Sequence, residues 1–159
     1  MAFDIAKQYL DSKGYGDRVL VFDDSSATVE LAAQRIGTEP ARIAKSLTFL
    51  VDDAAVMILF AGDARVDNVK FKAFFHTKAK MLSYDQVHDM IGHDVGGVCP
   101  FGIKEGVKVY LDESLKRFDI VYPACGDSVS AVKLTLTELE QLSNSLSWVD
   151  VCSYEGCGA

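Results

Sequence analysis

AKSLTFLV at residues 44–51 and AAVMILFA at residues 54–61 decide the fold. Both runs are apolar and rich in residues that favour strands, and only Asp52 and Asp53 separate them. Two such runs joined by two turn-forming residues predict a β-hairpin. Shorter apolar runs predict further strands at residues 18–22, 106–111, 120–122 and 131–136.

Capping residues and helical spacing predict the helices around this hairpin. Ser83 with Gln86, and Thr137 with Glu140, match the capping box, in which two side chains satisfy free N–H groups at a helix start. The predicted helices span residues 3–13, a segment from the hydroxyls of Ser25, Ser26 and Thr28 to Ile36, residues 67–75, a short helix closed by Gly92, residues 112–118, and a last helix through Leu142. Strands and helices alternate irregularly and no linker interrupts them. The sequence therefore predicts one α+β domain over residues 1–159, with a mixed, mostly antiparallel sheet flanked by helices.

Composition narrows the class of protein. Of the 159 residues, 49% are apolar and 25% are charged, which is ordinary globular usage in a chain long enough for one core. No apolar run approaches the ~20 residues of a membrane-spanning helix, and the N-terminal sequence MAFDIAKQYL lacks the pattern of a signal peptide. We therefore expect a cytoplasmic protein without a membrane partner.

The charge of the chain argues against some partners. A net charge of −7 disfavours broad, sequence-blind binding to DNA or RNA, which needs many phosphate contacts from lysine and arginine. We therefore expect no DNA partner. The same charge is compatible with a protein that grips only one end of an RNA.

Residues 65–80 are an exception to the acidic balance. This stretch carries one acid, Asp67, and the five basic residues Arg65, Lys70, Lys72, Lys78 and Lys80. In the helix predicted over residues 67–75, Val69, Ala73 and Phe74 are expected to face inward. The basic side chains are then either a solvated helix face or a contact for the end of an RNA.

Two features could carry chemistry. Lys45 lies near the start of an apolar strand, where a lysine either extends to solvent or directs its charge into a pocket. GHDVGGVCPFG at residues 92–102 holds four glycines, which indicates that backbone conformation matters there. That loop is either a tight structural connection or a set of N–H groups that approach a ligand oxygen.

Cysteines offer two weaker alternatives. Cys99 with His93 or His76 could form a thiol nucleophile, but a small packed loop residue is the simpler interpretation. Cys152 and Cys157 have four residues between them and no nearby histidine, whereas a structural zinc site needs four ligands. We therefore expect no metal site.

Four segments occur together in an order typical of one family. They are SATVELAA at residues 26–33, IAKSL at 43–47, GHDVGGVCPFG at 92–102 and ACG at 124–126. On these segments, and over roughly residues 3–150, the chain resembles the YbaK/EbsC family, which is homologous to the editing domain of bacterial prolyl-tRNA synthetase. The resemblance implies a barrel-like core. It also implies hydrolysis of the ester that joins a wrong amino acid to the terminal adenosine of a tRNA.

The resemblance also implies roles for particular residues. Lys45 matches the essential lysine of the family, and Gly96 matches the first glycine of a Gly-x-x-x-Pro loop whose backbone contacts the aminoacyl ester. The implied substrate-binding positions are Phe22, Thr28, Ser46, His93, Gly97, Pro100, Ala124 and Gly126. Neither a metal nor another cofactor is implied. The implied partner is the acceptor end of a mischarged tRNA, and an aminoacyl-tRNA synthetase is a further candidate.

Two departures from the family leave the substrate open. Ala124 stands where cysteinyl-tRNA deacylases carry a serine, and Val129 stands where many relatives carry an asparagine. Two other functional classes also remain open. One is a non-catalytic module that binds an aminoacylated RNA end or a small ligand, and the other is a thiol hydrolase that uses Cys99.

Overall fold

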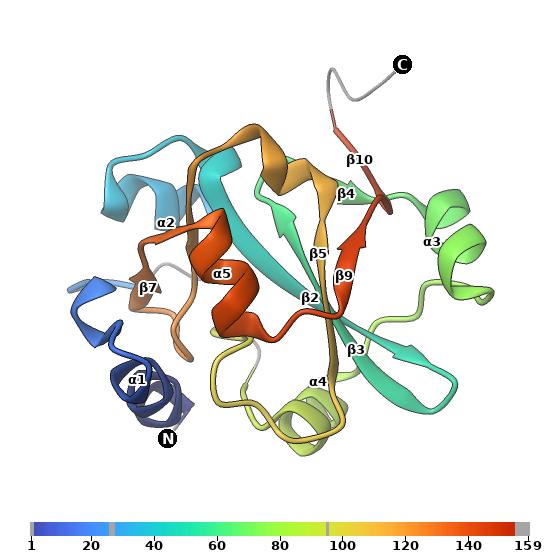
Figure 1. Cartoon of the computed structure of the whole chain (residues 1–159), viewed down its shortest axis with the longest axis horizontal. Helices are drawn as coiled ribbons and strands as arrows, with labels where there is room; N and C mark the ends of the chain where they lie inside the picture. Colours follow the sequence, from blue (N-terminus) through green and yellow to red (C-terminus); the bar gives the residue numbers. More distant parts are fainter. Residues whose placement is uncertain (1, 26–27, 95, 155–159) are drawn as a thin grey trace.

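A six-stranded sheet organises the computed structural model, which describes residues 2–25, 28–94 and 96–154 (Figure 1). Ser26, Ala27, Val95 and Cys157, which the sequence analysis used, lie outside these residues. In spatial order the strands are β8 (Leu134–Thr135), β6 (Ile120–Pro123), β2 (Ile43–Val51), β3 (Ala54–Ala61), β5 (Lys108–Asp112) and β9 (Ser147–Val149). The sheet curls into a half-barrel around the core.

The predicted hairpin is confirmed at the centre of this sheet. β2 and β3 pair in antiparallel register from Ala44↔Ala61 to Val51↔Ala54. Asp52 and Asp53 both take positive φ values, 50° and 64°, as a two-residue turn between strands requires. Every residue of β3 after Ala54 is buried, so its continuous apolar run reflects a strand covered on both faces.

The sheet mixes both strand directions, as predicted. β2 pairs antiparallel with β3, and β6 pairs antiparallel with β8. The contacts of β2 with β6, β3 with β5 and β5 with β9 are parallel. Two small antiparallel pairs complete the described strands: β1 (Val19–Val21) with β7 (Ser130–Val132), and β4 (Arg65–Val66) with β10 (Cys152–Ser153).

Helices surround the sheet without covering it evenly (Figure 1). They are α1 (Ala2–Ser12), α2 (Val29–Ile36), α3 (Asn68–Phe75), α4 (Tyr84–Gln86), which continues as a π-helical turn over Val87–Ile91, and α5 (Leu136–Ser143). Short 3₁₀ segments lie at Gly16–Arg18, Pro40–Arg42 and Glu113–Arg117. Within the described chain, no helix has the length and apolar character to cross a membrane.

The predicted inward face of α3 is wrong. Val69 is 81% exposed and Phe74 is 44% exposed, whereas Phe71 is fully buried. The Phe71 ring packs against Phe49 and Phe75, with ring centroids 4.9 Å and 4.6 Å apart. Phe71 and Phe75 stand four residues apart on one helix face, so burial of two aromatic rings decided which side of α3 faces the core.

One of the two predicted capping boxes is displaced. The box at Ser83 and Gln86 is confirmed, but the box of α5 uses Thr135 and Glu138 instead of Thr137 and Glu140. The predicted strand 131–136 is correspondingly split into β7 and β8. The sequence TLTELE offers two overlapping matches to the same pattern. The match whose threonine ends β8 is the one that forms.

Candidate functional site

A cavity of about 480 Å³ lies beside β2. Its walls come from α2, from β2 itself, from Met81, Leu82 and Val87, from the loop at residues 96–98, and from the end of β6, the start of β7 and the loop between these two strands. Most of the lining is apolar. Its polar side chains are Thr28, Lys45, Ser46, Thr48, Tyr122, Asp127 and Ser130.

Lys45 projects from the third position of β2 and lines the cavity. Its side chain is half-buried, and Nζ donates a hydrogen bond to the carbonyl oxygen of Gly62 at 3.3 Å. Burial lowers the pKa of Lys45, and the nearby carboxylates of Asp63 and Glu30 partly oppose that shift. The lysine therefore brings a charge to the cavity wall instead of extending it into open solvent.

The carbonyl that holds Lys45 is itself tightly placed. A Cβ at Gly62 would lie 2.0 Å from the Pro40 carbonyl oxygen and 2.7 Å from Val29, so only glycine fits there. The next residue, Asp63, accepts hydrogen bonds from both terminal nitrogens of Arg117, at 2.9 Å and 2.5 Å. These contacts fix the wall against which the ammonium group rests.

Ser46 offers the cavity an unused hydroxyl. Its Oγ is buried and has no hydrogen-bond partner among the residues that the structure describes. Buried polar atoms are rarely left unpaired in folded proteins. A hydroxyl of this kind in the wall of a cavity is available to a polar group of a bound ligand.

The two central glycines of the glycine-rich loop have different roles. Gly96 lines the cavity with φ of 104°, and a Cβ there would meet no atom within 4 Å. Gly97 is buried, and a Cβ there would lie 2.3 Å from Cα of Asp127. The Gly97 N–H also donates to the carbonyl of Asp94 at 3.3 Å. Gly96 is thus exposed to a ligand, while Gly97 allows two loops to touch.

The structure brings Cys99 and His93 together but in an inert environment. Nδ1 of His93 accepts a hydrogen bond from the Cys99 N–H at 3.3 Å and lies 3.6 Å from Sγ. Cys99 is 0% and His93 1% exposed. Burial raises the pKa of the Cys99 thiol far above its usual range and lowers the pKa of His93. A nucleophilic cysteine needs an accessible thiolate, so this geometry disfavours the thiol-hydrolase alternative. His76, the other predicted partner, instead ends α3.

The remaining predicted site residues fall into two groups. Thr28 and Ala124 line the cavity together with Lys45, Ser46 and Gly96. The residues that do not line it are Phe22, His93, Gly97, Pro100 and Gly126. Of these, Phe22 donates its N–H to the Val129 carbonyl at 2.7 Å, Pro100 is buried, and a Cβ on Gly126 would lie 2.5 Å from the Ala2 carbonyl oxygen.

Sequence reasoning missed Asp127 and Ser130. Oδ1 of Asp127 accepts hydrogen bonds from the Ser130 hydroxyl at 2.6 Å and from the Val129 N–H at 3.0 Å. Among the described residues that line the cavity, Asp127 is the single carboxylate and Lys45 the single cation. The sequence signal was available in the turn-forming run GDS directly after Cys125.

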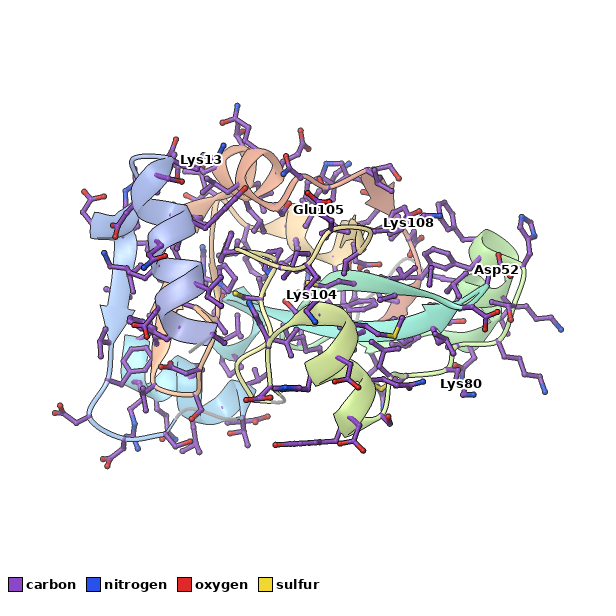
Figure 2. All side chains as sticks on the ribbon, turned by 90° about the horizontal axis from the view of Figure 1, so that it is seen from below. Lys13, Asp52, Lys80, Lys104, Glu105 and Lys108 are labelled. Atoms are coloured by element: carbon purple, nitrogen blue, oxygen red, sulfur yellow. The ribbon has the colours of Figure 1, made fainter. Side chains whose placement is uncertain are left out.

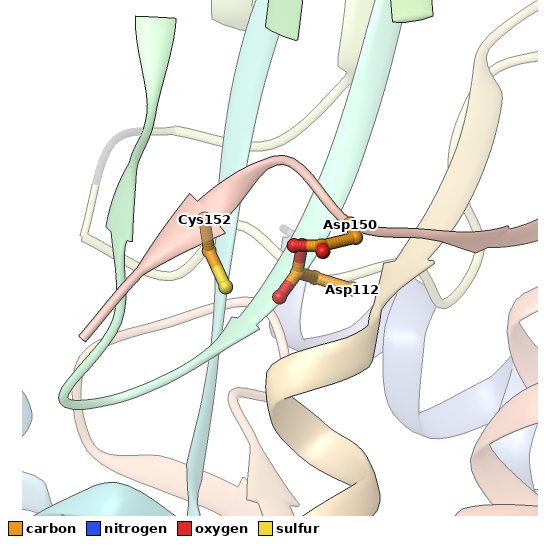
Figure 3. Close-up of side chains that lie close together, drawn as sticks. All are labelled: Asp112, Asp150 and Cys152. Carbon is orange, nitrogen blue, oxygen red and sulfur yellow. The ribbon is translucent and has the colours of Figure 1, made fainter. Parts of the chain in front are cut away.

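A second cluster of ligating atoms lies away from this cavity. The side chains of Asp112, Asp150 and Cys152 come within 4.8 Å of one another (Figure 3). The Asp112 carboxylate accepts the N–H groups of Ser114 and Val151, at 2.9 Å and 3.0 Å, and Asp150 pairs with a lysine of α3 at 3.1 Å. The carboxylates are therefore engaged by protein donors, which explains the cluster as a structural junction.

The sequence matches the model of the aminoacyl-tRNA editing domain over residues 23–142. The chain is 52% identical over 135 residues to the uncharacterized protein YwhH of Bacillus subtilis (strain 168), covering 84% of this chain and 86% of that protein. It is 32% identical over 115 residues to a proline–tRNA ligase of Halalkalibacterium halodurans. That match covers 72% of this chain but only 20% of the ligase, so it concerns one part of that enzyme.

Solved structures agree with these matches. A protein described as a proposed trans-editing enzyme for prolyl tRNA synthetase superposes with a TM-score of 0.86 at 27% identity, covering 96% of this chain and 97% of that one. The resemblance identified from the Lys-Ser-Leu and glycine-rich segments is thereby confirmed. The chain belongs to the family of aminoacyl-tRNA editing domains and is homologous to the editing region of prolyl-tRNA synthetase.

Proposed function

We propose that this protein hydrolyses the ester bond of a mischarged aminoacyl-tRNA, with the reaction centre in the cavity beside β2. The observation that carries the proposal is the placement of Lys45 and Gly96 on the wall of one cavity. Membership of the editing-domain family supplies the substrate class. The acting unit is proposed to be residues 1–159 as one cytoplasmic domain, with neither metal nor other cofactor in the reaction.

Opposite charges in the cavity suggest how the substrate is oriented. An aminoacyl ester carries an ammonium group on one side of the scissile carbonyl and a ribose with its phosphate on the other. Asp127 is suited to the ammonium group, and Lys45 to the ester, the ribose or the phosphate. Ser46 is suited to a polar atom of the substrate, since its hydroxyl is otherwise unpaired.

Ester hydrolysis requires stabilisation of an oxyanion. Water attacks the carbonyl carbon, the bond to the ribose oxygen breaks, and that oxygen takes up a proton, which releases the amino acid and a tRNA with a free hydroxyl. A backbone N–H aimed at the developing charge supplies roughly 3–4 kcal/mol. Because the Gly97 N–H is already bonded to Asp94, we assign this role to the Gly96 N–H.

The attacking water needs a group to orient it. Asp127 is assigned to the ammonium group of the substrate, and Lys45 is a donor, so we assign neither as the general base. We propose that the ribose hydroxyl next to the ester assists the attack. The neighbouring residues His93, Gly97, Pro100 and Gly126 are proposed to hold the loops in place, and Thr28 and Ala124 to border the substrate. Phe22, which does not line the cavity, is proposed to support it through its hydrogen bond to Val129.

A deacylation screen tests this function. Purified protein is incubated with a panel of tRNAs, each carrying a cognate or a wrong amino acid, and release of the amino acid is followed over time. We expect release from at least one mischarged tRNA and little from correctly charged ones. Binding of every mischarged tRNA without turnover would instead establish the non-catalytic module.

A further inference from the structure

A second groove, of about 680 Å³, runs beside α3. Its lining residues are Asn68, Val69, Lys72, Ala73, Lys78 and Ala79. It includes Val69 and Ala73, two of the three residues of α3 that the sequence predicted to face inward, and Val69 is 81% exposed. The groove therefore joins an unburied apolar floor to lysine side chains.

Two lysines, Lys72 and Lys78, line this groove, and Lys80 follows the groove in the chain. Lys72, Lys78 and Lys80 are exposed, and their side chains form no hydrogen bond or salt bridge with any residue in the described ranges. Lys70 differs, because its Nζ donates to Asp150 at 3.1 Å and to the Cys152 carbonyl at 2.9 Å. Lys70 therefore ties α3 to the C-terminal strand, while its three neighbours are available to a partner.

Acidic residues do not cancel this charge. The hairpin turn places Asp52 at the same end of the molecule as Lys80 (Figure 2), and Asp53 adjoins it. Neither aspartate forms a salt bridge with a described lysine. Two free lysines in the groove lining, with Lys80 directly after it in the chain, are notable in a protein with a net charge of −7, which otherwise repels polyanions.

One short segment of chain borders both the groove and the cavity. Ala79 lines the groove, and Met81, two residues later, lines the cavity and is 54% exposed. The connecting segment is fixed along β2, because Leu50 donates its N–H to the Lys80 carbonyl at 2.8 Å and Leu82 donates to the Thr48 carbonyl at 3.1 Å. A ligand chain that leaves the cavity past Met81 and follows this segment would reach the groove at Ala79.

The groove and Lys45 in the cavity are too far apart to contact the same phosphate or amino-acid group of a ligand. Met81 pairs with Phe49, which is four residues from Lys45 along β2. A strand rises about 3.3 Å per residue, so Met81, at the edge of the cavity, lies about 13 Å from the lysine, and Ala79, where the groove begins, lies about 20 Å from it. The longer distance corresponds to about six stacked nucleotides at ~3.4 Å each. Whatever occupies the groove therefore lies several nucleotides before the reacting ester.

We propose that Lys72, Lys78 and Lys80 bind the phosphate backbone of the RNA that precedes the aminoacylated nucleotide. This inference rests on the proposed function, because it needs an RNA end in the cavity. Lysine ammonium groups bind phosphates as point charges, and the apolar floor suits ribose and base faces. Contact with the backbone makes the interaction tolerant of sequence and sensitive to salt.

Two matched double variants test the groove. Lys72→Gln with Lys78→Gln removes two groove charges, and Lys13→Gln with Lys133→Gln removes two exposed charges elsewhere; Figure 2 shows Lys13 at the opposite end from Lys80. The probe is an uncharged proline tRNA transcript, and Kd is measured from 50 to 200 mM salt. Circular dichroism verifies the fold of each variant.

We expect the groove variant to bind about tenfold or more weakly at 0.1 M salt, and its salt slope to fall by about 1.4, because each lost single-strand phosphate contact contributes ~0.7. The control variant should keep the wild-type slope. Equal effects of the two variants would overturn the proposal. Normal tRNA binding with impaired binding to a purified prolyl-tRNA synthetase would also overturn it, since the groove would then receive a protein.

Hydrolysis of small esters separates this proposal from the reaction itself. A panel of aminoacyl-adenosines is too short to reach the groove, so the groove variant should hydrolyse these esters at the wild-type rate. If the wild-type protein hydrolyses neither these esters nor any mischarged tRNA, the proposed function fails, whatever the binding result. If the wild type is active and the two variants bind tRNA alike, only the groove assignment fails.

Discussion

Nζ of Lys45 donates a hydrogen bond to the carbonyl oxygen of Gly62 at 3.3 Å, which holds the ammonium group against the cavity wall. The acceptor is a neutral carbonyl that cannot move, since a Cβ on Gly62 would overlap Pro40. A partly desolvated cation with one neutral acceptor retains N–H donors for a ligand. Lys45 is thus positioned before substrate arrives and is not consumed by an internal ion pair.

Replacing Lys45 should separate activity from stability. Lys45→Met removes a half-buried charge but keeps most of the apolar stem, so we expect thermal stability to be unchanged or higher. The single-turnover deacylation rate should fall about a hundredfold to a thousandfold, because loss of one charged contact at the reaction centre costs ~3–4 kcal/mol. Lys13→Met serves as the control. An active Lys45→Met protein would remove this lysine from the site.

The pH dependence of the rate should report the ionisation of Lys45. Burial lowers the pKa of this ammonium group, so a reaction that needs its charge slows as pH rises through a value below the usual lysine range. The unfolded chain holds that proton more tightly, so the contribution of Lys45 to stability increases as pH rises from the lowered pKa to the ordinary one, ~10.4. Lys45→Arg, whose guanidinium stays charged, should lose the alkaline decline.

Asp63 provides a sharper version of this pH experiment. Its carboxylate raises the pKa of Lys45, so Asp63→Asn should move the alkaline decline to lower pH. Asp119→Asn is the matched control, because it also removes a carboxylate that pairs with an arginine, Arg42, at 3.0 Å, away from the cavity lining. Rates are corrected for spontaneous ester hydrolysis. An unchanged profile in Asp63→Asn would show that the decline belongs to another group.

Truncation of Cys99 and truncation of His93 should differ in their effect on the reaction rate. Cys99→Ala removes a buried neutral thiol, so we expect a modest loss of stability and a single-turnover rate within a few-fold of wild type. His93→Ala removes the acceptor of the Cys99 N–H, which leaves a buried donor unpaired at a cost of ~1–3 kcal/mol. It also loosens the loop that carries Gly96, and a displacement of ~1 Å can cost about a hundredfold in rate.

Thermal denaturation and single-turnover kinetics distinguish these outcomes. A thousandfold loss in a folded Cys99→Ala protein would restore the thiol hydrolase and remove the present mechanism. Equal activity of His93→Ala and wild type would show that the loop keeps its shape without the imidazole.

Local sequence patterns predicted the parts of the fold that depend on neighbours in the chain. The hairpin around Asp52 and Asp53 was predictable because two long apolar runs meet at a two-residue turn. The inward face of α3 was not, because Val69 and Phe71 are both apolar and only contact with Phe49 selects between them. Position along the chain does not reveal which side of a short helix meets a distant strand.

In the site, too, local patterns could be predicted from the sequence, but contacts between distant segments could not. Lys45 and Gly96 were placed at the reaction centre through family resemblance, and the structure places both on one cavity wall. Asp127 was missed because a turn aspartate looks like local capping, which it also performs toward Val129. The separation of Gly96 from Gly97 needs the position of a second loop, since only the approach of Asp127 makes a side chain at Gly97 impossible.

The last prediction concerns Gly96. Its φ of 104° is a conformation that side chains other than glycine rarely adopt, whereas a Cβ would meet no atom within 4 Å. Gly96→Ala should therefore act through the backbone, at a strain of ~1–3 kcal/mol that turns the N–H away from the oxyanion. We expect the single-turnover rate to fall about a hundredfold or more, with substrate affinity little changed.

Val98→Ala is the matched control, because Val98 lines the same cavity from the same loop and needs no special φ. It should alter affinity more than rate, since it removes apolar contact and leaves the backbone in place. A substrate that lacks the hydroxyl next to the ester is then tested with both variants. If that hydroxyl orients the water, the deoxy substrate should bind normally and react slowly with wild type and with Val98→Ala. Equal rates on the two substrates would remove the ribose from the mechanism, and a wild-type rate for Gly96→Ala would leave Lys45 as the only supported part of the reaction centre.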